Sequence, residues 1–278
     1  MQKKLSHTKR KDSKLIRKNK VKKILQSSGT AFGTFVSFMD PAVVEIMGHI
    51  GFDFVVIDNE HVSMDKNIVV NMMRASEIEG AGIMPFVRVK EGSDTEILQA
   101  LDAGAMGIQI PGVDTYEQAK QITQAMYYQP KGNRGMGSGQ RGIGYGFMDR
   151  FEYFEMANEE ILTIIQCESI ESVHNIDKIL TIEEVDIIFV GAMDLSCSMG
   201  PEIMGRRNHP ELVKVFNETV KKIIDAGKIA GASVGDASEI QEMKDLGVRY
   251  MSVGIDLAFL KSAAKRGFDL CKNIVKGN

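Results

Sequence analysis

The stretch Gly51-Phe-Asp-Phe-Val-Val-Ile-Asp-Asn-Glu-His61 decides how the rest of the chain is interpreted, because an apolar run ends abruptly in polar side chains. Residues 54–57 are aromatic or β-branched and lie close behind a glycine, which is typical of a buried strand. Asp58, Glu60 and His61 then stand at the carboxyl end of that strand, where parallel α/β proteins place their catalytic groups. Taken alone, the pattern fits a capping aspartate and two solvated side chains equally well. The ends of the other strands decide between the two interpretations.

The composition indicates an ordinary globular protein rather than a membrane or disulfide-rich one. The chain has 278 residues, of which 44% are hydrophobic and 26% charged, enough for one large α/β domain or two ordinary ones. It lacks the run of ~18 apolar residues that a membrane helix needs. The odd cysteines Cys167, Cys197 and Cys271 lack metal-type spacing, which predicts free thiols in a reducing compartment. We therefore expect a soluble, cytoplasmic protein.

The net charge of −3 conceals a basic amino terminus. Residues 1–23 hold eleven Lys or Arg residues and one acidic residue, a net charge of +10, which leaves −13 for the rest. The segment lacks the apolar core of a signal peptide and has too much lysine for a typical transit peptide. We expect residues 1–23 to form a flexible extension and residues 24–278 a single catalytic domain. Because the body is acidic, we expect no nucleic-acid binding as the main function.

From Thr30 onward, short apolar runs alternate with segments of helical periodicity. We expect strands at residues 31–37, 54–58, 84–89, 107–110, 161–166, 186–190, 229–233 and 250–253. We expect helices at residues 41–49, 65–79, 95–103, 115–126, 209–226 and 238–245, and from residues 172 and 257 onward. Eight strands alternating with about eight helices over roughly 245 residues is typical of an α/β fold of the closed (β/α)8 TIM-barrel class. An open doubly wound sheet is the competing fold.

A glycine-rich stretch, residues 127–150, interrupts this alternation. It lacks the Lys-Ser/Thr of a Walker loop, and no buried strand feeds it as a dinucleotide-binding fingerprint requires. A loop of this length inside a compact domain is commonly functional or disordered. We interpret its glycines as allowing either close approach of the backbone to a ligand or movement as a lid.

Polar side chains stand at the carboxyl ends of four predicted strands, and in a barrel these ends meet at one mouth. The sequence therefore predicts a single site from residues that are distant along the chain. Its candidate members are Asp58, Glu60 and His61 after the second strand, Arg88 at the third, Gln166 and Glu168 at the fifth, and Asp194 after the sixth.

Two of these residues, Glu168 and Asp194, supply the hard carboxylate oxygens that Mg²⁺ or Mn²⁺ accepts, with Co²⁺ as a further candidate. The remaining positions of such a cation suit the keto and carboxylate oxygens of a 2-oxo acid, whose ketone the cation would polarise. Arg88 is permanently cationic and suited to hold the oxyanion of the resulting enolate. His61 is a residue type suited to exchange the proton.

Two further residues are ambiguous by this reasoning. Lys90 follows the third strand, but a solvated lysine is more usual there than a Schiff-base nucleophile, which favours metal-assisted chemistry over an imine. Asp102, at the end of a predicted helix, would by default be a surface acid. Spacing does not show whether the fold brings Asp102 to His61.

With these residues in view, the chain resembles the class II, metal-dependent pyruvate aldolases of the 2,4-dihydroxyhept-2-enedioate and 2-dehydro-3-deoxyglucarate aldolase type. The similarity runs from about residue 33 to residue 265. The blocks that carry it are Gly51-Phe-Asp-Phe, Ile57-Asp-Asn-Glu-His61, Pro85-Phe-Val-Arg-Val89, Leu101-Asp-Ala-Gly104, Gly132-Asn-Arg-Gly135, Gln166-Cys-Glu168, and Val190-Gly-Ala-Met-Asp-Leu-Ser196 with Met199-Gly200.

The resemblance implies a (β/α)8 barrel, commonly a homohexamer built as a trimer of dimers, whose last helix is exchanged with a neighbouring subunit. The implied reaction is reversible retro-aldol cleavage of a 4-hydroxy-2-oxo acid to pyruvate and an aldehyde. The implied roles are His61 as base with Asp102 as its partner, Arg88 stabilising the enolate, Glu168 and Asp194 holding the metal, Gln166 and the backbone at Met193 binding the oxo acid, and Asp58 and Glu60 as supports.

Departures from the family pattern leave the substrate open. Asn59 replaces a common glycine, and Gly191-Ala-Met-Asp194 replaces Gly-Pro-x-Asp, so that Ala192 and Met193 reshape the pocket floor; the glycine-rich stretch is also about one residue longer. Relatives also run the enolate step toward condensation, including citrate formation. A binding protein that has lost turnover is the alternative from another class, and it predicts damage to a constellation that is intact in this sequence.

Overall fold

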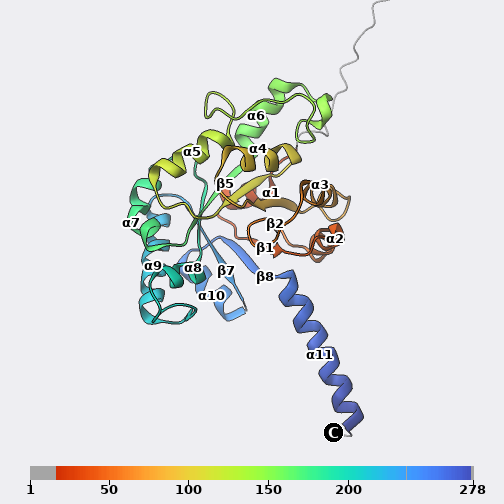
Figure 1. Cartoon of the computed structure of the whole chain (residues 1–278), viewed down its shortest axis with the longest axis vertical. Coiled ribbons are helices and arrows are strands. Elements are labelled where there is room, and N and C mark those ends of the chain that lie inside the picture. Colours follow the sequence, from red (N-terminus) through yellow and green to blue (C-terminus); the bar gives the residue numbers. More distant parts are fainter. Residues whose placement is uncertain (1–16, 236, 277–278) are drawn as a thin grey trace, which may run out of the picture.

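The computed structural model describes residues 17–235 and 237–276, and eight parallel strands form a closed barrel at its centre (Figure 1). The order around the barrel follows the order along the chain, so the predicted TIM-barrel fold is confirmed. Each predicted strand is present, with its ends shifted by at most two residues. The strands are β1 (Ala31–Val36), β2 (Phe54–Asp58), β3 (Met84–Arg88), β4 (Gly107–Ile110), β5 (Leu162–Cys167), β6 (Ile187–Val190), β7 (Ile229–Val234) and β8 (Tyr250–Ile255).

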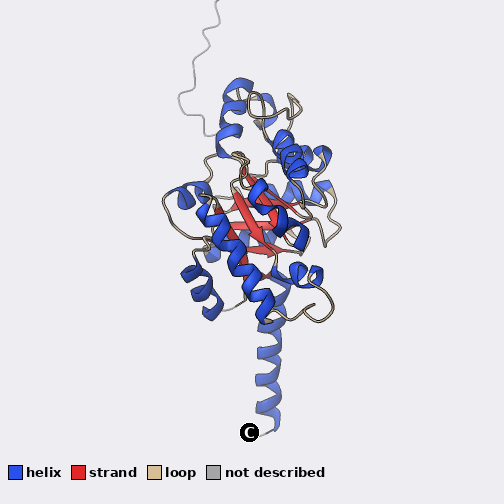
Figure 2. Cartoon of the chain, turned by 90° about the vertical axis from the view of Figure 1, so that its left-hand side faces the viewer, coloured by secondary structure: helices blue, strands red, loops and turns tan. Residues whose placement is uncertain are grey.

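Helices surround the strands on the outside, and Figure 2 shows them enclosing the sheet. In the part of the chain that the structure describes, none of them is long and apolar enough to cross a membrane. The helices are α1 (Lys20–Gln26), α2 (Pro41–Ile50), α3 (Lys66–Ala75), α4 (Asp94–Ala103), α5 (Tyr116–Met126), α6 (Arg150–Glu160), α7 (Ile170–Ile179), α8 (Ala192–Ser198), α9 (Pro210–Asp225), α10 (Ala237–Leu246) and α11 (Asp256–Lys276), with a 3-10 turn η1 at Gly144–Gly146.

The predicted helix starts have clear local causes. Asp40 caps α2 by accepting the backbone N–H of Ala42, and Pro41 occupies the first helical position as predicted. The predicted helix at residues 65–79 ends earlier, at Ala75, because Ser76 caps it and turns the chain. Two helices, α6 and α8, were not predicted.

The alternation of side chains along each strand separates an inner core from an outer one. On β2, Phe54 and Val56 face the interior of the barrel, whereas Val55 and Ile57 pack against the surrounding helices. The interior layer is aromatic: the Phe54 ring stacks 4.3 Å from Tyr250 and 5.4 Å from Phe86, measured between ring centroids. By the same alternation, the next inward position on β2 is Asp58, at the carboxyl end.

Helix α1 closes the amino end of the barrel, because Val21 and Leu25 are buried in the inner cluster. Asn19 caps the helix, and its side-chain amide donates to the carbonyls of Met106 and Glu160. Helix α1 therefore crosses the expected boundary between residues 23 and 24. Residues 1–16 of the expected flexible extension lie outside the described residues.

The glycine-rich stretch lies at the amino end of the barrel, away from the strand ends that carry the candidate site residues. Arg141 donates to the carbonyl of Ala103, and Gly142 donates to that of Asp102, both at the end of α4. A Cβ atom at Gly142 would lie 2.9 Å from the carbonyl oxygen of Leu101, so this glycine serves close packing of protein against protein. The stretch is therefore not a lid over the site of its own chain, contrary to that interpretation.

Helix α11 extends away from the barrel (Figure 1). Several large apolar side chains along it are exposed in this single chain, including Leu260, Phe268, Leu270, Ile274 and Val275.

Candidate active site

The first half of the site is a buried ion-pair cluster at the carboxyl ends of β2 and β3. Asp58 and Arg88 are paired directly across the two strands, so both side chains point into the barrel mouth. The guanidinium of Arg88 donates from Nε to Asp58 Oδ1 at 3.0 Å and from Nη2 to Asp58 Oδ2 at 2.9 Å. Its Nη1 lies 2.8 Å from Glu60 Oε2, and its plane lies over the ring of Phe35, 4.7 Å from the centroid. Arg88 is thereby fixed in position by two carboxylates and an aromatic ring.

Asp58 also shapes the chain that follows it. Its Oδ1 accepts the backbone N–H groups of Glu60, at 3.1 Å, and of His61, at 3.3 Å. This turn directs the Glu60 side chain back toward Arg88 and leaves the His61 side chain 65% exposed. The predicted supporting role of Asp58 and Glu60 therefore has a geometric basis.

The second half of the site is a hydrogen-bonded row of side chains at the ends of β4 and β5. Gln109 donates to Gln166 Oε1 at 2.6 Å, and Gln166 donates to Glu168 Oε2 at 2.5 Å. The other oxygen of Glu168 accepts the backbone N–H of Gly112 at 2.7 Å. Gln166 is thereby held with its amide toward Glu168, and the Glu168 carboxylate is fixed at both oxygens.

Gln109 is a site residue that sequence reasoning missed. It is fully buried, and it also accepts a long hydrogen bond of 3.5 Å from the hydroxyl of Tyr250. A glutamine in the middle of the apolar strand Gly107-Ile-Gln-Ile110 was the available signal, because a buried amide requires partners.

Three carboxylates lie within electrostatic reach of one another between the two halves. Burial raises the pKa of Glu168, and the charges of Glu60 and Asp194 raise it further, although the bonds from Gly112 and Gln166 oppose this. Burial also raises the pKa of Glu60, with Arg88 and His61 opposing it and Asp58 and Asp194 adding to it. A positive charge between these carboxylates would relieve their repulsion.

Asp194 and Met193 lie in the first turn of α8, and both side chains are exposed. Gly191 precedes them, and a Cβ atom there would lie 3.1 Å from Glu168 Oε2. The glycine thus leaves room for the Glu168 carboxylate beside the start of α8. A cavity of about 430 Å³ opens next to Glu60 and Glu168, with Gly112 in its wall.

The sequence model of one protein family matches residues 31–263, described as HpcH/HpaI aldolase/citrate lyase. The chain belongs to this family. Its aldolase and lyase members cleave carbon–carbon bonds, so the expected resemblance and the expected enzyme class, a carbon–carbon lyase of the aldolase type, are both confirmed.

Individual members of the HpcH/HpaI family are similar to this chain over most of their length. A hydroxypyruvate/pyruvate aldolase of Roseobacter denitrificans is 36% identical over 89% of this chain and 94% of its own. A 2-keto-3-deoxy-L-rhamnonate aldolase of Salmonella gallinarum is 33% identical over 92% and 94%. The crystal structure of the citrate synthase SbnG is 29% identical, covers 92% of this chain and 98% of that chain, and superposes with a TM-score of 0.82.

Asp102 is the member of the predicted HpcH/HpaI constellation that this chain does not bring to the others. It lies at the end of α4, which runs antiparallel to the strands and so ends at the opposite side of the barrel. Its carboxylate accepts from Arg134 at 2.9 Å and from Gln140 at 3.2 Å. No hydrogen bond or ion pair joins Asp102 to His61 within residues 17–235 and 237–276, so their pairing stays a prediction.

The donor set suits a hard divalent cation of the kind expected for HpcH/HpaI aldolases. Each oxygen of Glu168 accepts one hydrogen bond and retains a lone pair, and no described residue forms a hydrogen bond or ion pair with the Asp194 carboxylate. Among the described residues, no three His, Cys, Asp or Glu side chains are close enough to hold a metal by themselves. Two carboxylates completed by substrate and water are a usual arrangement for Mg²⁺.

Proposed function

We propose that this protein cleaves a 4-hydroxy-2-oxo acid reversibly to pyruvate and an aldehyde, with a divalent cation at Glu168 and Asp194. The observation that carries the proposal is the convergence of two rigid clusters on one mouth. One cluster fixes the guanidinium of Arg88, and the other fixes the carboxylate of Glu168. A fixed guanidinium can stabilise the enolate oxygen, and a fixed carboxylate can hold the cation that polarises the ketone.

Arg88 would hold the negative charge that develops on the substrate oxygen. A guanidinium carries five N–H donors, and the two hydrogen bonds to Asp58 leave three donors, on Nη1 and Nη2, next to the ion pair with Glu60. Since its partners lock the side chain, little reorganisation accompanies the reaction.

His61 would accept and return the proton. Its side chain is on the loop after β2, and its Nε2 lies 4.0 Å from Glu60 Oε2. The Glu60 carboxylate can hold the imidazole toward the mouth and stabilise its charged form when the proton is taken. We infer that Glu60 acts on His61 and Arg88 rather than on substrate.

When bound, the cation would supply Lewis acidity toward the 2-oxo group. Mg²⁺ and Mn²⁺ are the proposed ions, with Co²⁺ as a further candidate, because the donor set is made of hard oxygens. Gln166, held by Gln109, would donate toward the oxo acid, and the backbone at Met193 would bind its carboxylate.

The proposed substrates follow those that the relatives' names state. Hydroxypyruvate or pyruvate as the enolate component, and a short hydroxy-aldehyde as the acceptor, fit a cavity of about 430 Å³. Lys90 and Glu91 line the same cavity and would meet the acceptor's polar end.

We further propose a homo-oligomer, a hexamer by resemblance to the family, in which α11 is exchanged between subunits. The exposed apolar side chains of α11, Phe268 and Ile274 among them, support a covered position for this helix. We also propose a cytoplasmic location, supported by the free state of Cys167, Cys197 and Cys271.

The decisive experiment measures pyruvate release from a panel of 4-hydroxy-2-oxo acids, coupled to lactate dehydrogenase, with and without Mg²⁺. We expect turnover that EDTA abolishes and added cation restores. A second readout is exchange of the pyruvate methyl protons with solvent, which His61→Ala should slow by roughly 10²–10⁴-fold. Exchange that survives His61→Ala would refute the assignment of the base, whereas absence of all exchange from the native enzyme would refute the function.

Condensation is the second candidate, because the similarity to the citrate synthase SbnG covers nearly the whole chain. The enolate step is common to both directions, and only the acceptor differs. Citrate formation from oxaloacetate and acetyl-CoA, without pyruvate release from any hydroxy-oxo acid, would favour condensation over the aldolase.

A further inference from the structure

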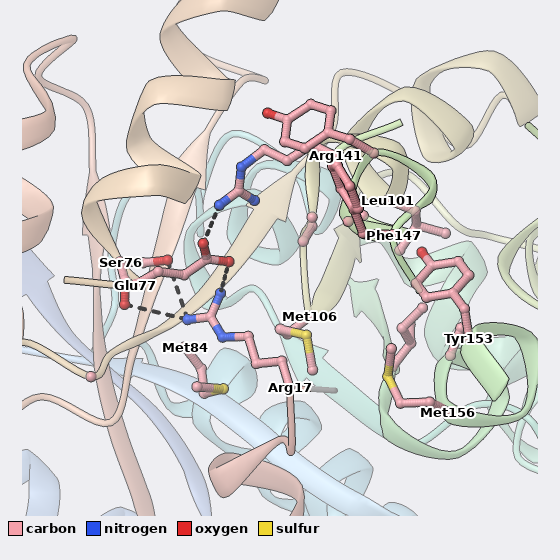
Figure 3. Close-up of a pocket in the computed structure, with 18 residues that line it drawn as sticks. Arg17, Ser76, Glu77, Met84, Leu101, Met106, Arg141, Phe147, Tyr153 and Met156 are labelled. Atoms are coloured by element: carbon pink, nitrogen blue, oxygen red, sulfur yellow. Dashed lines mark hydrogen bonds and ion pairs between the residues drawn. The ribbon is translucent and has the colours of Figure 1, made fainter. Parts of the chain in front are cut away.

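A second large cavity, about 720 Å³, lies at the amino end of the barrel (Figure 3). It is bounded by the ends of α3 and α4, the start of β3, the turn η1 and helix α6. Its volume falls within the range of small-molecule sites in proteins. The residues described above as the candidate active site are absent from its lining.

One side of this cavity is cationic. Arg17 donates to Glu77 Oε1 at 3.2 Å, to the carbonyl of Ile83 at 2.8 Å and to Ser76 Oγ at 3.2 Å. Arg141 reaches the other oxygen of the same Glu77 carboxylate. The described charged side chains in the lining are these two arginines and Glu77, so the cavity carries an excess of one positive charge.

Arg17 is held in a partly buried position by these contacts. Burial lowers the pKa of Arg17 to about 10, with Glu77 opposing this and the charge of Arg141 adding to it. A second anion beside Arg17 would raise the pKa of its guanidinium, as Glu77 does.

The opposite side of the cavity is apolar. Met106, Met156 and Leu101 form buried walls, while Phe147 stands at the rim with 86% of its surface exposed. Figure 3 shows these side chains facing the arginine pair across the cavity. Methionine is flexible and polarisable, so such walls adapt to an apolar chain of varying shape.

We propose that this cavity is a second ligand site, which binds a carboxylate with an unbranched apolar tail of medium length. The carboxylate would lie beside Glu77, against the guanidinium groups of Arg17 and Arg141, and would neutralise the positive charge that Glu77 leaves. The tail would lie along the methionine wall. A single excess positive charge matches a monoanion better than a phosphate dianion.

The cavity is separate from the active site, and one of its residues lies outside the segment that the family model matches. Met84 begins β3 and lines this cavity, whereas Arg88 ends the same strand, about 13 Å away at the usual rise per residue. Arg17 precedes residues 31–263, which the family matches, so an essential part of the cavity comes from this chain's own amino-terminal segment.

The test uses the full chain and three probes in isothermal titration calorimetry: octanoate, octylamine and inorganic phosphate. We expect octanoate to bind with one site per chain and at least tenfold more tightly than the other two. Acetate, which has the charge without the tail, should also bind at least tenfold more weakly than octanoate. Equal binding of octylamine, or tighter binding of phosphate, would overturn the proposal.

Location is tested with Arg141→Met and a matched control, Arg150→Met, which removes an exposed arginine on α6. Arg141→Met should weaken octanoate at least tenfold, and Arg150→Met should change it less than twofold. Because Arg141→Met alters packing, methyl NMR of labelled methionines in the native protein provides an independent readout. Octanoate should shift the Met106 and Met156 methyls and leave Met193 unchanged; a shift confined to Met193 would place the ligand at the active site and refute the proposal.

Discussion

The two ends of the barrel use the same ingredients, arginine and carboxylate, in opposite ratios. In the cavity at the amino end, Arg17 and Arg141 share Glu77, the one described acid of the lining. At the carboxyl end, Arg88 is the described arginine among four carboxylates, those of Asp58, Glu60, Glu168 and Asp194. The excess charge is therefore positive in the cavity at the amino end and negative in the mouth at the carboxyl end. An ion pair does not by itself indicate what a site binds; the uncompensated charge around it does.

The largest effect is expected at the carboxyl end, from loss of the proposed cation ligand. Glu168→Ala should lower kcat/KM for retro-aldol cleavage on the order of 10³-fold, because it removes the charge that would hold the cation. Glu171→Ala, an exposed acid on α7, is the matched control and should stay within twofold. Mg²⁺ titration followed by calorimetry should show loss of binding in Glu168→Ala alone. Unchanged Mg²⁺ affinity would remove Glu168 from the site.

A smaller but still large effect is expected from Arg88→Lys. Lysine keeps the charge but cannot bond Asp58 at both oxygens while reaching Glu60, so kcat should fall about 10²-fold. Steady-state kinetics on the purified variant measures this, with Arg74→Lys on α3 as the control. A change in KM without a change in kcat would mean that Arg88 binds substrate equally in the ground and transition states.

The excess negative charge at the carboxyl end also predicts that the stabilisation of the protein by a bound cation depends on pH. The pKa values of Glu60 and Glu168 are raised above their usual 4.5, so the native cation-free protein binds more protons than the unfolded chain just above that pH. Its stability from these groups falls as pH rises through that window. Since Mg²⁺ requires the ionised carboxylates, the increase in Tm on adding Mg²⁺ should be larger at pH 7.5 than at pH 5.

Thermal unfolding by circular dichroism at both pH values measures this difference. The same increase in Tm at pH 5 and pH 7.5 would contradict it.

The smallest effect is expected at the amino end. Glu77→Gln should leave kcat/KM within twofold, since Glu77 lies at the opposite end of the barrel from the proposed chemistry. It should lower Tm by about 2–3 °C, because two partly buried arginines lose a shared partner that is itself 44% exposed and thus partly screened. A large loss of turnover with unchanged Tm would show that the two ends are coupled.

The barrel was predictable because each of its buried strands is a short run of apolar residues in the sequence. The run before Asp58 and the one before Arg88 end where their strands end, and parallel strands necessarily bring those ends together. The positions of Arg88 and Glu168 at the carboxyl ends of their strands could therefore be predicted from the sequence, while their catalytic roles stay a prediction. Helix α8 was missed because it is one short segment of seven residues directly behind a strand.

Other parts of the site could not be read from sequence. Asp102 ends a helix between two parallel strands, so the predicted alternation already places it at the far side of the barrel, but its contacts with Arg134 and Gln140 could not be predicted from spacing. Gln109 lies in a strand whose pattern reads as apolar, and its partners Gln166 and Tyr250 are distant along the chain. The Arg17 cavity depends on a residue in a segment expected to be solvated.

Helix α1 has a consequence for how the molecule assembles. It is synthesised before the strands whose amino end it closes, yet Asn19 bonds to Met106 and Glu160, and the carbonyl of Leu25 accepts from Arg249. Helix α1 is therefore made before the strands of the barrel, but it cannot complete its contacts with them until the last strand, β8, has been made. Contacts of such long sequence separation form late in folding. The apolar side chains of Val21 and Leu25 would therefore stay exposed to solvent in the nascent chain.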